Sequence, residues 1–235
     1  HRARGMTGRG LALSNGIVMC ATGRKFLDEA RVAVRQIRRV YPEVAIRVFT
    51  DDPAAADDLH GAEVAVVPHP RYGNSDKFHA VANTPFARTL YLDTDVHVRG
   101  GLEELFTLLE RFDVLACYDA ARFQYPDYEL AIGSAAEPQL NGGVLALRDA
   151  RGFAQAWRTE YDRFVEWLEA NVAEDGRLYW DQVALRAAVL RTGQRLHILP
   201  PEYNMRPNQV VALPPKIVHN RAFLRLPEAK RDAVL

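Results

Sequence analysis

Short apolar runs alternate with amphipathic stretches through the first half of the chain, which predicts strands alternating with helices. The run GIVMCA at 16–21 is apolar throughout, as in a strand buried on both faces. Apolar residues recur at helical spacing over 25–40, and Tyr41-Pro42 ends that pattern. The same criteria predict strands at 44–50, 63–67, 89–92 and 113–117, and helices at 77–83 and 102–112.

The second half of the chain has a less regular pattern. One helix face is apolar from Phe153 to Leu168, and 180–190 is apolar nearly all round, as in a buried helix. We expect short strands at 144–147, 196–199 and 216–218, and a loop over 118–143. The order of elements predicts an α/β fold with a mainly parallel central sheet flanked by helices. We divide the chain into a flexible tail, 1–15, and a single domain, 16–235.

Composition narrows the class of protein. The 235 residues include 30 Lys plus Arg and 30 Asp plus Glu, so the formal net charge is zero, and we expect no nucleic-acid partner. A hydrophobic content of 48% excludes a disordered chain and a collagen-like fibre. No apolar run reaches the ~20 residues of a membrane span, so we expect no transmembrane segment and a cytoplasmic location. Cys20 and Cys117 lie in apolar surroundings and are expected to be free thiols.

The strongest chemical signal is the segment YLDTDVHV at 91–98. Asp93 and Asp95 follow a predicted buried strand and are separated by one residue. Ligand sites of open α/β sheets gather at the carboxyl ends of strands. Two neighbouring carboxylates repel each other unless a positive charge intervenes, and oxygen ligands suit Mg²⁺ or Mn²⁺. The pair therefore indicates a divalent-metal site. In the simpler alternative, Asp93 caps a turn and Asp95 is solvated.

This segment resembles the DxD motif of GT-A glycosyltransferases, particularly the glycogenin-like and bacterial galactosyltransferase-like group (family 8 and relatives). Further segments resemble motifs of that family and occur in the family's order, across roughly residues 16–220. They are Lys77-Phe78 before the DxD strand, Asn141-Gly142-Gly143-Val144 at a strand entry, Trp180-Asp181-Gln182 at a helix start and Lys216-Ile217-Val218-His219 at a late strand.

The resemblance implies a GT-A domain that transfers a sugar from a nucleotide-diphosphate sugar, a UDP-sugar by resemblance, to a hydroxyl of a carbohydrate or other acceptor, with retention. A divalent cation, Mn²⁺ or Mg²⁺, would bind Asp93, Asp95 and His219 and stabilise the diphosphate as it leaves. The catalytic candidates are Asn141, Asp181 and Gln182. The candidates for donor binding are Ala21, Thr22, Gly23, Arg24, Asp51, Lys77, Asp93, Thr94, Gly142 and Gly143.

Some of these residues also have a purely structural explanation. His219 is consistent with a buried, hydrogen-bonded histidine, and Asp181 with a helix N-cap. Asp51 is consistent with a turn that ends a strand. Lys77 would either contact the diphosphate or pair with a carboxylate.

The chain departs from the family after His219. The family's Gly and Lys-Pro-Trp elements are missing there, so the Lys that binds the diphosphate in relatives has no clear counterpart. Arg221 or Arg225 is a possible substitute because a guanidinium suits phosphate.

Three other functions share part of the pattern. A haloacid-dehalogenase-like phosphatase needs Thr or Val two places after the second Asp, where this chain has His97. A sugar nucleotidylyltransferase would carry a Gly-rich loop with Arg and Pro-Lys after the first strand, which ATGRKFLDEA lacks. The third is a catalytically inactive nucleotide- or carbohydrate-binding protein of the same fold. The intact aspartates, asparagine and histidine of the motifs argue against it.

Overall fold

The computed structural model describes residues 15–227 and 230, apart from 57, 120–123 and 208. Residues 1–14 of the predicted tail lie outside the described residues, and Asn15 already belongs to the first strand. No helix in the described part of the chain is long and apolar enough to cross a membrane. Cys20 and Cys117 are free thiols, as predicted.

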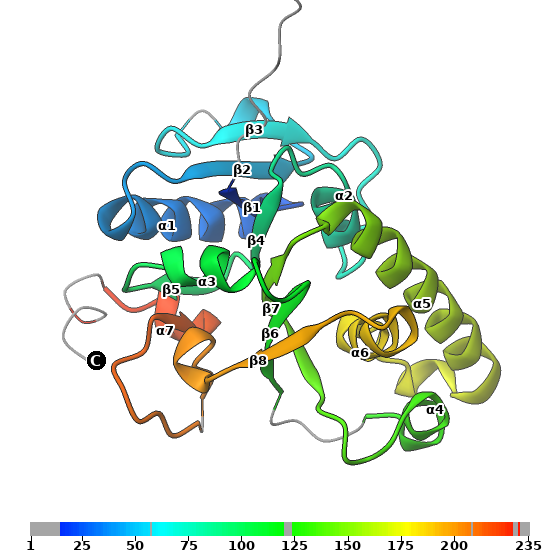
Figure 1. Ribbon diagram of the computed structural model, residues 1–235. Coiled ribbons are helices and arrows are strands. Elements are labelled where there is room, and N and C mark those ends of the chain that lie inside the picture. Colours follow the sequence, from blue (N-terminus) through cyan, green and yellow to red (C-terminus); the bar gives the residue numbers. More distant parts are fainter. Residues whose placement is uncertain (1–14, 57, 120–123, 208, 228–229, 231–235) are drawn as a thin grey trace, which may run out of the picture.

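The described residues form a seven-stranded sheet with helices on both faces (Figure 1). Its strands are β1 (Asn15–Cys20), β2 (Ala45–Thr50), β3 (Glu63–Val66), β4 (Arg88–Leu92), β6 (Val114–Tyr118), β7 (Leu140–Leu147) and β8 (Leu196–Leu199). Their spatial order is β3-β2-β1-β4-β7-β6-β8. β7 runs antiparallel to both of its neighbours, and the other four pairings are parallel, so the prediction of a mainly parallel sheet is confirmed.

The helices form two layers, one on each face of the sheet. They are α1 (Arg24–Val40), α2 (Asp76–Ala82), α3 (Glu103–Leu108), α4 (Pro126–Ile132), α5 (Ala150–Asn171), α6 (Asp181–Thr192) and α7 (Arg221–Leu224). Ile17 and Met19 of β1 pack in the layer that contains α1 and α3, whereas Val18 packs in the layer of α2, α5 and α6. Because β1 and β7 are buried on both faces, their sequences have few polar side chains at consecutive positions, whereas the edge strands β3 and β8 are partly exposed.

Two of the predicted elements are wrong in part. The segment 118–143, expected as a loop, contains α4 and the beginning of β7. β7 is eight residues long, whereas only 144–147 was predicted as strand. The first half of β7 was not predicted because it contains Gly142 and Gly143, and glycine is depleted in strands. The helix expected over 102–112 is also shorter, because α3 ends at Leu108 and turns follow.

A second, two-stranded sheet connects distant parts of the chain. β5 (Val96–Val98) follows the DxD segment and pairs antiparallel with β9 (Ile217–His219), with Val96 opposite His219. Asn220 then caps α7, since its side-chain oxygen accepts hydrogen bonds from the N–H groups of Ala222 and Phe223. This pairing brings the late histidine to the end of β4.

Candidate functional site

The predicted motifs meet at one edge of the sheet because the strand directions place them there. β1, β2 and β4 are parallel, so their carboxyl ends lie side by side. The strand order reverses between β1 and β4, which makes a topological switch point there. β7 is antiparallel to β4, so its first residues lie beside the end of β4, where the N–H of Asp93 donates to the carbonyl of Gly143 over 2.8 Å. A cleft of about 890 Å³ opens here.

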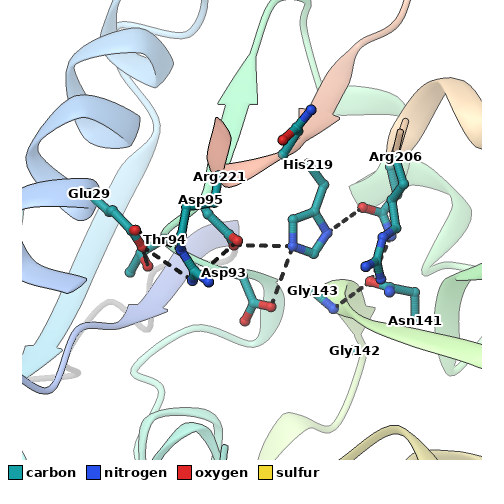
Figure 2. A network of polar contacts seen from close by, with 12 residues as sticks. Glu29, Asp93, Thr94, Asp95, Asn141, Gly142, Gly143, Arg206, His219 and Arg221 are labelled. Atoms are coloured by element: carbon teal, nitrogen blue, oxygen red, sulfur yellow. Dashed lines mark hydrogen bonds and ion pairs between the residues drawn. The ribbon is translucent and has the colours of Figure 1, made fainter. Parts of the chain in front are cut away.

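Asp93, Asp95 and His219 converge in this cleft (Figure 2). One ligand atom from each lies within 4.8 Å of the others. Nε2 of His219 is 3.1 Å from Oδ1 of Asp95 and 3.8 Å from Oδ2 of Asp93. Two carboxylates and an imidazole suit a divalent cation such as Mn²⁺ or Mg²⁺. The three residues predicted as metal ligands are thus brought together.

Asp95 is held in its charged form. Burial by itself raises the pKa of Asp95, but the hydrogen bond with His219 and the nearby Arg221 lower it to about 2. One guanidinium nitrogen of Arg221 lies 3.2 Å from Oδ2 of Asp95. At physiological pH this carboxylate is therefore ionised and available to a cation.

Helix α1 supports the DxD turn through Glu29, which the sequence did not indicate. Oγ1 of Thr94 donates to Oε2 of Glu29 over 2.9 Å, and Nε of Arg221 donates to Oε1 over 2.7 Å (Figure 2). Of the two arginines considered for the diphosphate, Arg221 lines the cleft, whereas Arg225 is exposed and does not.

Lys77 is buried between two carboxylates. Its Nζ lies 2.9 Å from Oδ2 of Asp181 and 3.2 Å from Oδ1 of Asp93, above the rings of Tyr91 and Trp157. Burial alone would lower the pKa of Lys77, but the two carboxylates raise it above its usual value. Burial raises the pKa of Asp181, and Lys77 offsets part of that rise. Asp181 is the first residue of α6, so it is not the N-cap of that helix.

Asn141 and Gln182 are held by a third residue, Asp119. Oδ2 of Asp119 accepts hydrogen bonds from Nδ2 of Asn141 over 2.9 Å and from Nε2 of Gln182 over 2.8 Å. Asp119 follows β6 and is buried. It was missed because it fell in a segment expected to be a loop, although its place after a predicted strand was a signal that could have found it.

The end of β1 is held by hydrogen bonds to acidic residues of other loops. Oγ1 of Thr22 donates to Oδ2 of Asp76 over 2.7 Å, and Asp76 also accepts from the N–H groups of Arg71 and Tyr72. Ala21 is fully buried. The side chains of Thr22 and Ala21 are thus committed to packing and to the strand end.

The β1–α1 turn depends on Gly23 and Asp51. Gly23 has φ +86°, a conformation that side chains rarely adopt, and its N–H donates to Oδ1 of Asp51 over 2.7 Å. Asp51 therefore supports the turn, which was its structural alternative. Arg24 is not brought into the cleft, because its side chain is 74% exposed and pairs with Asp28 on α1.

The glycines at the start of β7 leave room for the site. A methyl group at Gly143 would lie 2.7 Å from Nδ1 of His219 and 2.9 Å from Oδ2 of Asp93, and one at Gly142 would lie 2.6 Å from Oδ2 of Asp181. Both positions therefore require glycine for close approach, which fits a site that receives a ligand against the backbone.

Replacing Gly143 by Ala is expected to weaken Mn²⁺ binding by ~10–100-fold, because the added methyl group displaces the imidazole and one carboxylate. Electron paramagnetic resonance of free Mn²⁺ during a titration measures the change. Gly176→Ala is the control, since a methyl group there meets only Val172. Equal Mn²⁺ affinity in Gly143→Ala and wild type would contradict the proposed ligand geometry.

Solved structures with a similar fold are glycosyltransferases. The galactosyltransferase LgtC, in complex with donor and acceptor sugar analogues, aligns with a TM-score of 0.60 and 20% identity over 87% of this chain and 86% of that one. Mouse xyloside xylosyltransferase 1 aligns with a TM-score of 0.60 and 14% identity over 92% and 100%. Glycosyltransferase GlyE of Streptococcus pneumoniae aligns with a TM-score of 0.59 and 16% identity over 88% and 55%.

The chain therefore has the GT-A fold, as its motifs predicted. No protein-family model matches the chain, and the comparison with curated proteins yields no match.

Proposed function

We propose that this protein is a metal-dependent glycosyltransferase that moves a sugar from a UDP-sugar to an acceptor hydroxyl. The observation that carries this proposal is the convergence of Asp93, Asp95 and His219 beside Asn141 and Asp181 in one cleft of a GT-A fold. The LgtC structure holds donor and acceptor sugar analogues, which supports the same two classes of substrate here.

Asp93, Asp95 and His219 would hold the divalent cation. When bound, the cation stabilises negative charge on the leaving diphosphate. These three ligands fit a divalent cation, because two carboxylates balance its charge of +2 and a neutral imidazole adds no third negative charge. Arg221 is the cleft residue that we assign to the diphosphate in place of the missing Lys, since guanidinium geometry matches phosphate oxygens.

Asp181 is suited to binding sugar hydroxyls. It is buried, and its contact with the Lys77 ammonium favours the ionised form, which accepts hydrogen bonds. A general base for the acceptor needs a proton affinity near the working pH and access to the incoming hydroxyl. Asp181 is buried and its Oδ2 contacts the Lys77 ammonium, so an incoming hydroxyl has little access to it. We therefore assign Asp181 to donor binding, which agrees with a retaining reaction. Asn141 and Gln182, both held by Asp119, complete the polar wall around the sugar.

In this proposal, the ring of Tyr72 stacks on the base of the nucleotide. It lines the cleft, its side chain is 61% exposed, and it lies over the turn at Gly23, as a stacking platform for a base would. Replacing Tyr72 by Ala is expected to weaken UDP binding by ~5–150-fold, which corresponds to the ~1–3 kcal/mol lost with one base–aromatic stack. Calorimetry with UDP and with inorganic pyrophosphate measures this, and pyrophosphate affinity is expected to stay unchanged.

Tyr72→Phe keeps the ring but removes the hydrogen bond with Asp51, which contributes to the raised pKa of the Tyr72 hydroxyl. This variant is expected to bind UDP nearly as wild type does. If Tyr72→Ala also binds UDP as wild type does, the base lies elsewhere in the cleft.

Turnover tests the proposed activity itself. A set of UDP-sugars is incubated with the protein and Mn²⁺, and release of UDP is followed with and without EDTA. We expect release from at least one donor, loss of that release in EDTA, and a released sugar with the anomeric configuration of the donor. Metal-dependent nucleotide binding without release from any donor, alone or with sugar acceptors, would instead favour the catalytically inactive binding protein.

A further inference from the structure

Behind the proposed metal site, hydrogen bonds join three buried polar residues to Nδ1 of His219, the ring nitrogen that faces away from the aspartates. We propose that Asp119, Asn141 and Asn204 form a hydrogen-bond relay that keeps a hydrogen on Nδ1 of His219, so that Nε2, which faces the aspartates, is the ring nitrogen that binds the metal. This inference deepens the proposed function and rests on its metal site. Asn204 is a positioning residue in it.

The orientation of the first amide is set by its neighbours. Oδ1 of Asn141 accepts from the backbone N–H of Gly143 over 2.9 Å, and a backbone N–H can only donate. Nδ2 of Asn141 therefore points the other way, toward Oδ2 of Asp119 at 2.9 Å. The two contacts agree, because an ionised carboxylate only accepts.

The second amide follows from the first. Nδ2 of Asn204 lies 2.8 Å from Oδ1 of Asn141, and an oxygen at that place requires a donor from Asn204. The oxygen of Asn204 is then left facing Nδ1 of His219, also at 2.8 Å. An amide oxygen carries no hydrogen, so the hydrogen of this bond must be on Nδ1 of His219. Nε2 is then the ring nitrogen that faces Asp93 and Asp95.

Burial and backbone pairing protect this arrangement. Asn141 and Asn204 are each 1% exposed, so a reversed amide would place two oxygens together without water to separate them. Asn204 ends the short turn Pro201–Tyr203, and the next residue, Met205, forms backbone hydrogen bonds with Ile217 and His219. The backbone therefore holds Asn204 and the imidazole at a constant separation.

The relay has a measurable consequence for metal affinity. Partners that orient a ligating histidine from behind typically contribute 10–100-fold to metal binding, because they fix the tautomer and the ring direction. Asn204→Leu keeps the approximate size of the side chain but removes the acceptor. We expect this variant to bind Mn²⁺ ~10–100-fold more weakly than wild type, as measured by electron paramagnetic resonance of free Mn²⁺. Asn171→Leu, at an exposed position of α5, is the matched control and is expected to bind as wild type does.

Nitrogen NMR of this chain labelled with ¹⁵N-histidine tests the relay without measuring activity. The His219 signals are assigned by their loss in His219→Gln. We expect a hydrogen on Nδ1 of His219 in the metal-free protein and after addition of Mg²⁺, with Nε2 responding to the cation. In Asn204→Leu the Nδ1 hydrogen loses its acceptor, so we expect it to exchange with solvent faster than in wild type.

Two results would overturn the relay: an Nδ1 without hydrogen in wild type, or wild-type Mn²⁺ affinity in a folded Asn204→Leu. Thermal unfolding of the metal-free variant establishes folding, and the NMR measurement on wild type stands even if the variant does not fold. If wild type binds neither Mn²⁺ nor Mg²⁺, the proposed metal-dependent function fails, and the position of the Nδ1 hydrogen still decides the relay separately.

Discussion

Asp95→Ala is expected to abolish Mn²⁺-dependent binding of UDP and to lower sugar transfer by at least ~100-fold. The loss follows from the position of Asp95, whose carboxylate is the one nearest Nε2 of His219 and is kept ionised. A bound cation contributes several kcal/mol to stabilising a leaving phosphate, and about 2.7 kcal/mol corresponds to 100-fold. Calorimetric titration with UDP, in Mn²⁺ and in EDTA, measures the first effect, and UDP release from the donor measures the second.

Asp58→Ala is the matched control for that experiment. Asp58 has a side chain that is 82% exposed, and it does not line the cleft. Its replacement is expected to leave both measurements unchanged. Mn²⁺-dependent UDP binding that survives in Asp95→Ala would show that the cation, if one binds, is held by other residues.

Lys77→Met is expected to destabilise the fold by about 3–5 kcal/mol, the usual effect of removing one partner from a buried ion pair. The ammonium lies between Asp93 and Asp181, so its removal leaves two carboxylates close together without a cation. Urea denaturation measures the loss. Lys216→Met is the control, because the Lys216 side chain is 40% exposed and its ammonium lies 4.0 Å from Glu104. An exposed pair of that kind contributes about 0–1 kcal/mol.

The cost of Lys77→Met should grow with pH. Burial already raises the pKa of Asp181, and loss of the Lys77 charge removes an effect that lowers it. The native variant then keeps a proton that the unfolded chain has lost, so its stability falls as pH rises from about 4 to about 7. A difference between wild type and variant that stays constant over this range would contradict the contact between Lys77 and Asp181.

The strands that have apolar sequences could be predicted from the sequence pattern alone. A strand buried on both faces gives an apolar run, as at 16–21 in β1, and the mostly apolar segment 44–50 corresponds to β2. Of the three proposed metal ligands, Asp93 and Asp95 were indicated by local pattern, because they follow a predicted buried strand. His219 was indicated only by the resemblance to GT-A glycosyltransferases, since its local pattern also fits a buried, hydrogen-bonded histidine.

β7 shows where local pattern fails. Its first half contains Gly142 and Gly143, whose sequence suggests a turn, yet in the structure it is an interior strand that pairs antiparallel with β4 and β6. The glycines are there because Asp181, Asp93 and His219 leave no space for a side chain. That reason lies in residues distant along the chain, so it could not be read locally.

The polar contacts behind the site were not predictable for the same reason. Asn204 and Asn141 are 63 residues apart, and Arg221 and Glu29 are 192 apart. Asparagine at 204 and glutamate at 29 belong to no spacing pattern. Only the fold places Asn204 against a proposed metal ligand and Glu29 against the DxD turn.

Thermal unfolding of the wild-type protein with UDP, GDP, TDP and ADP, each in Mn²⁺ and in EDTA, tests the central claim most directly. A ligand at 100 times its dissociation constant stabilises the native state by ~2.7 kcal/mol, which is a readable shift. The proposed donor site predicts a shift with UDP in Mn²⁺ that EDTA removes. No shift with any of the four nucleotides in Mn²⁺ would contradict a metal-dependent nucleotide-sugar site in this cleft.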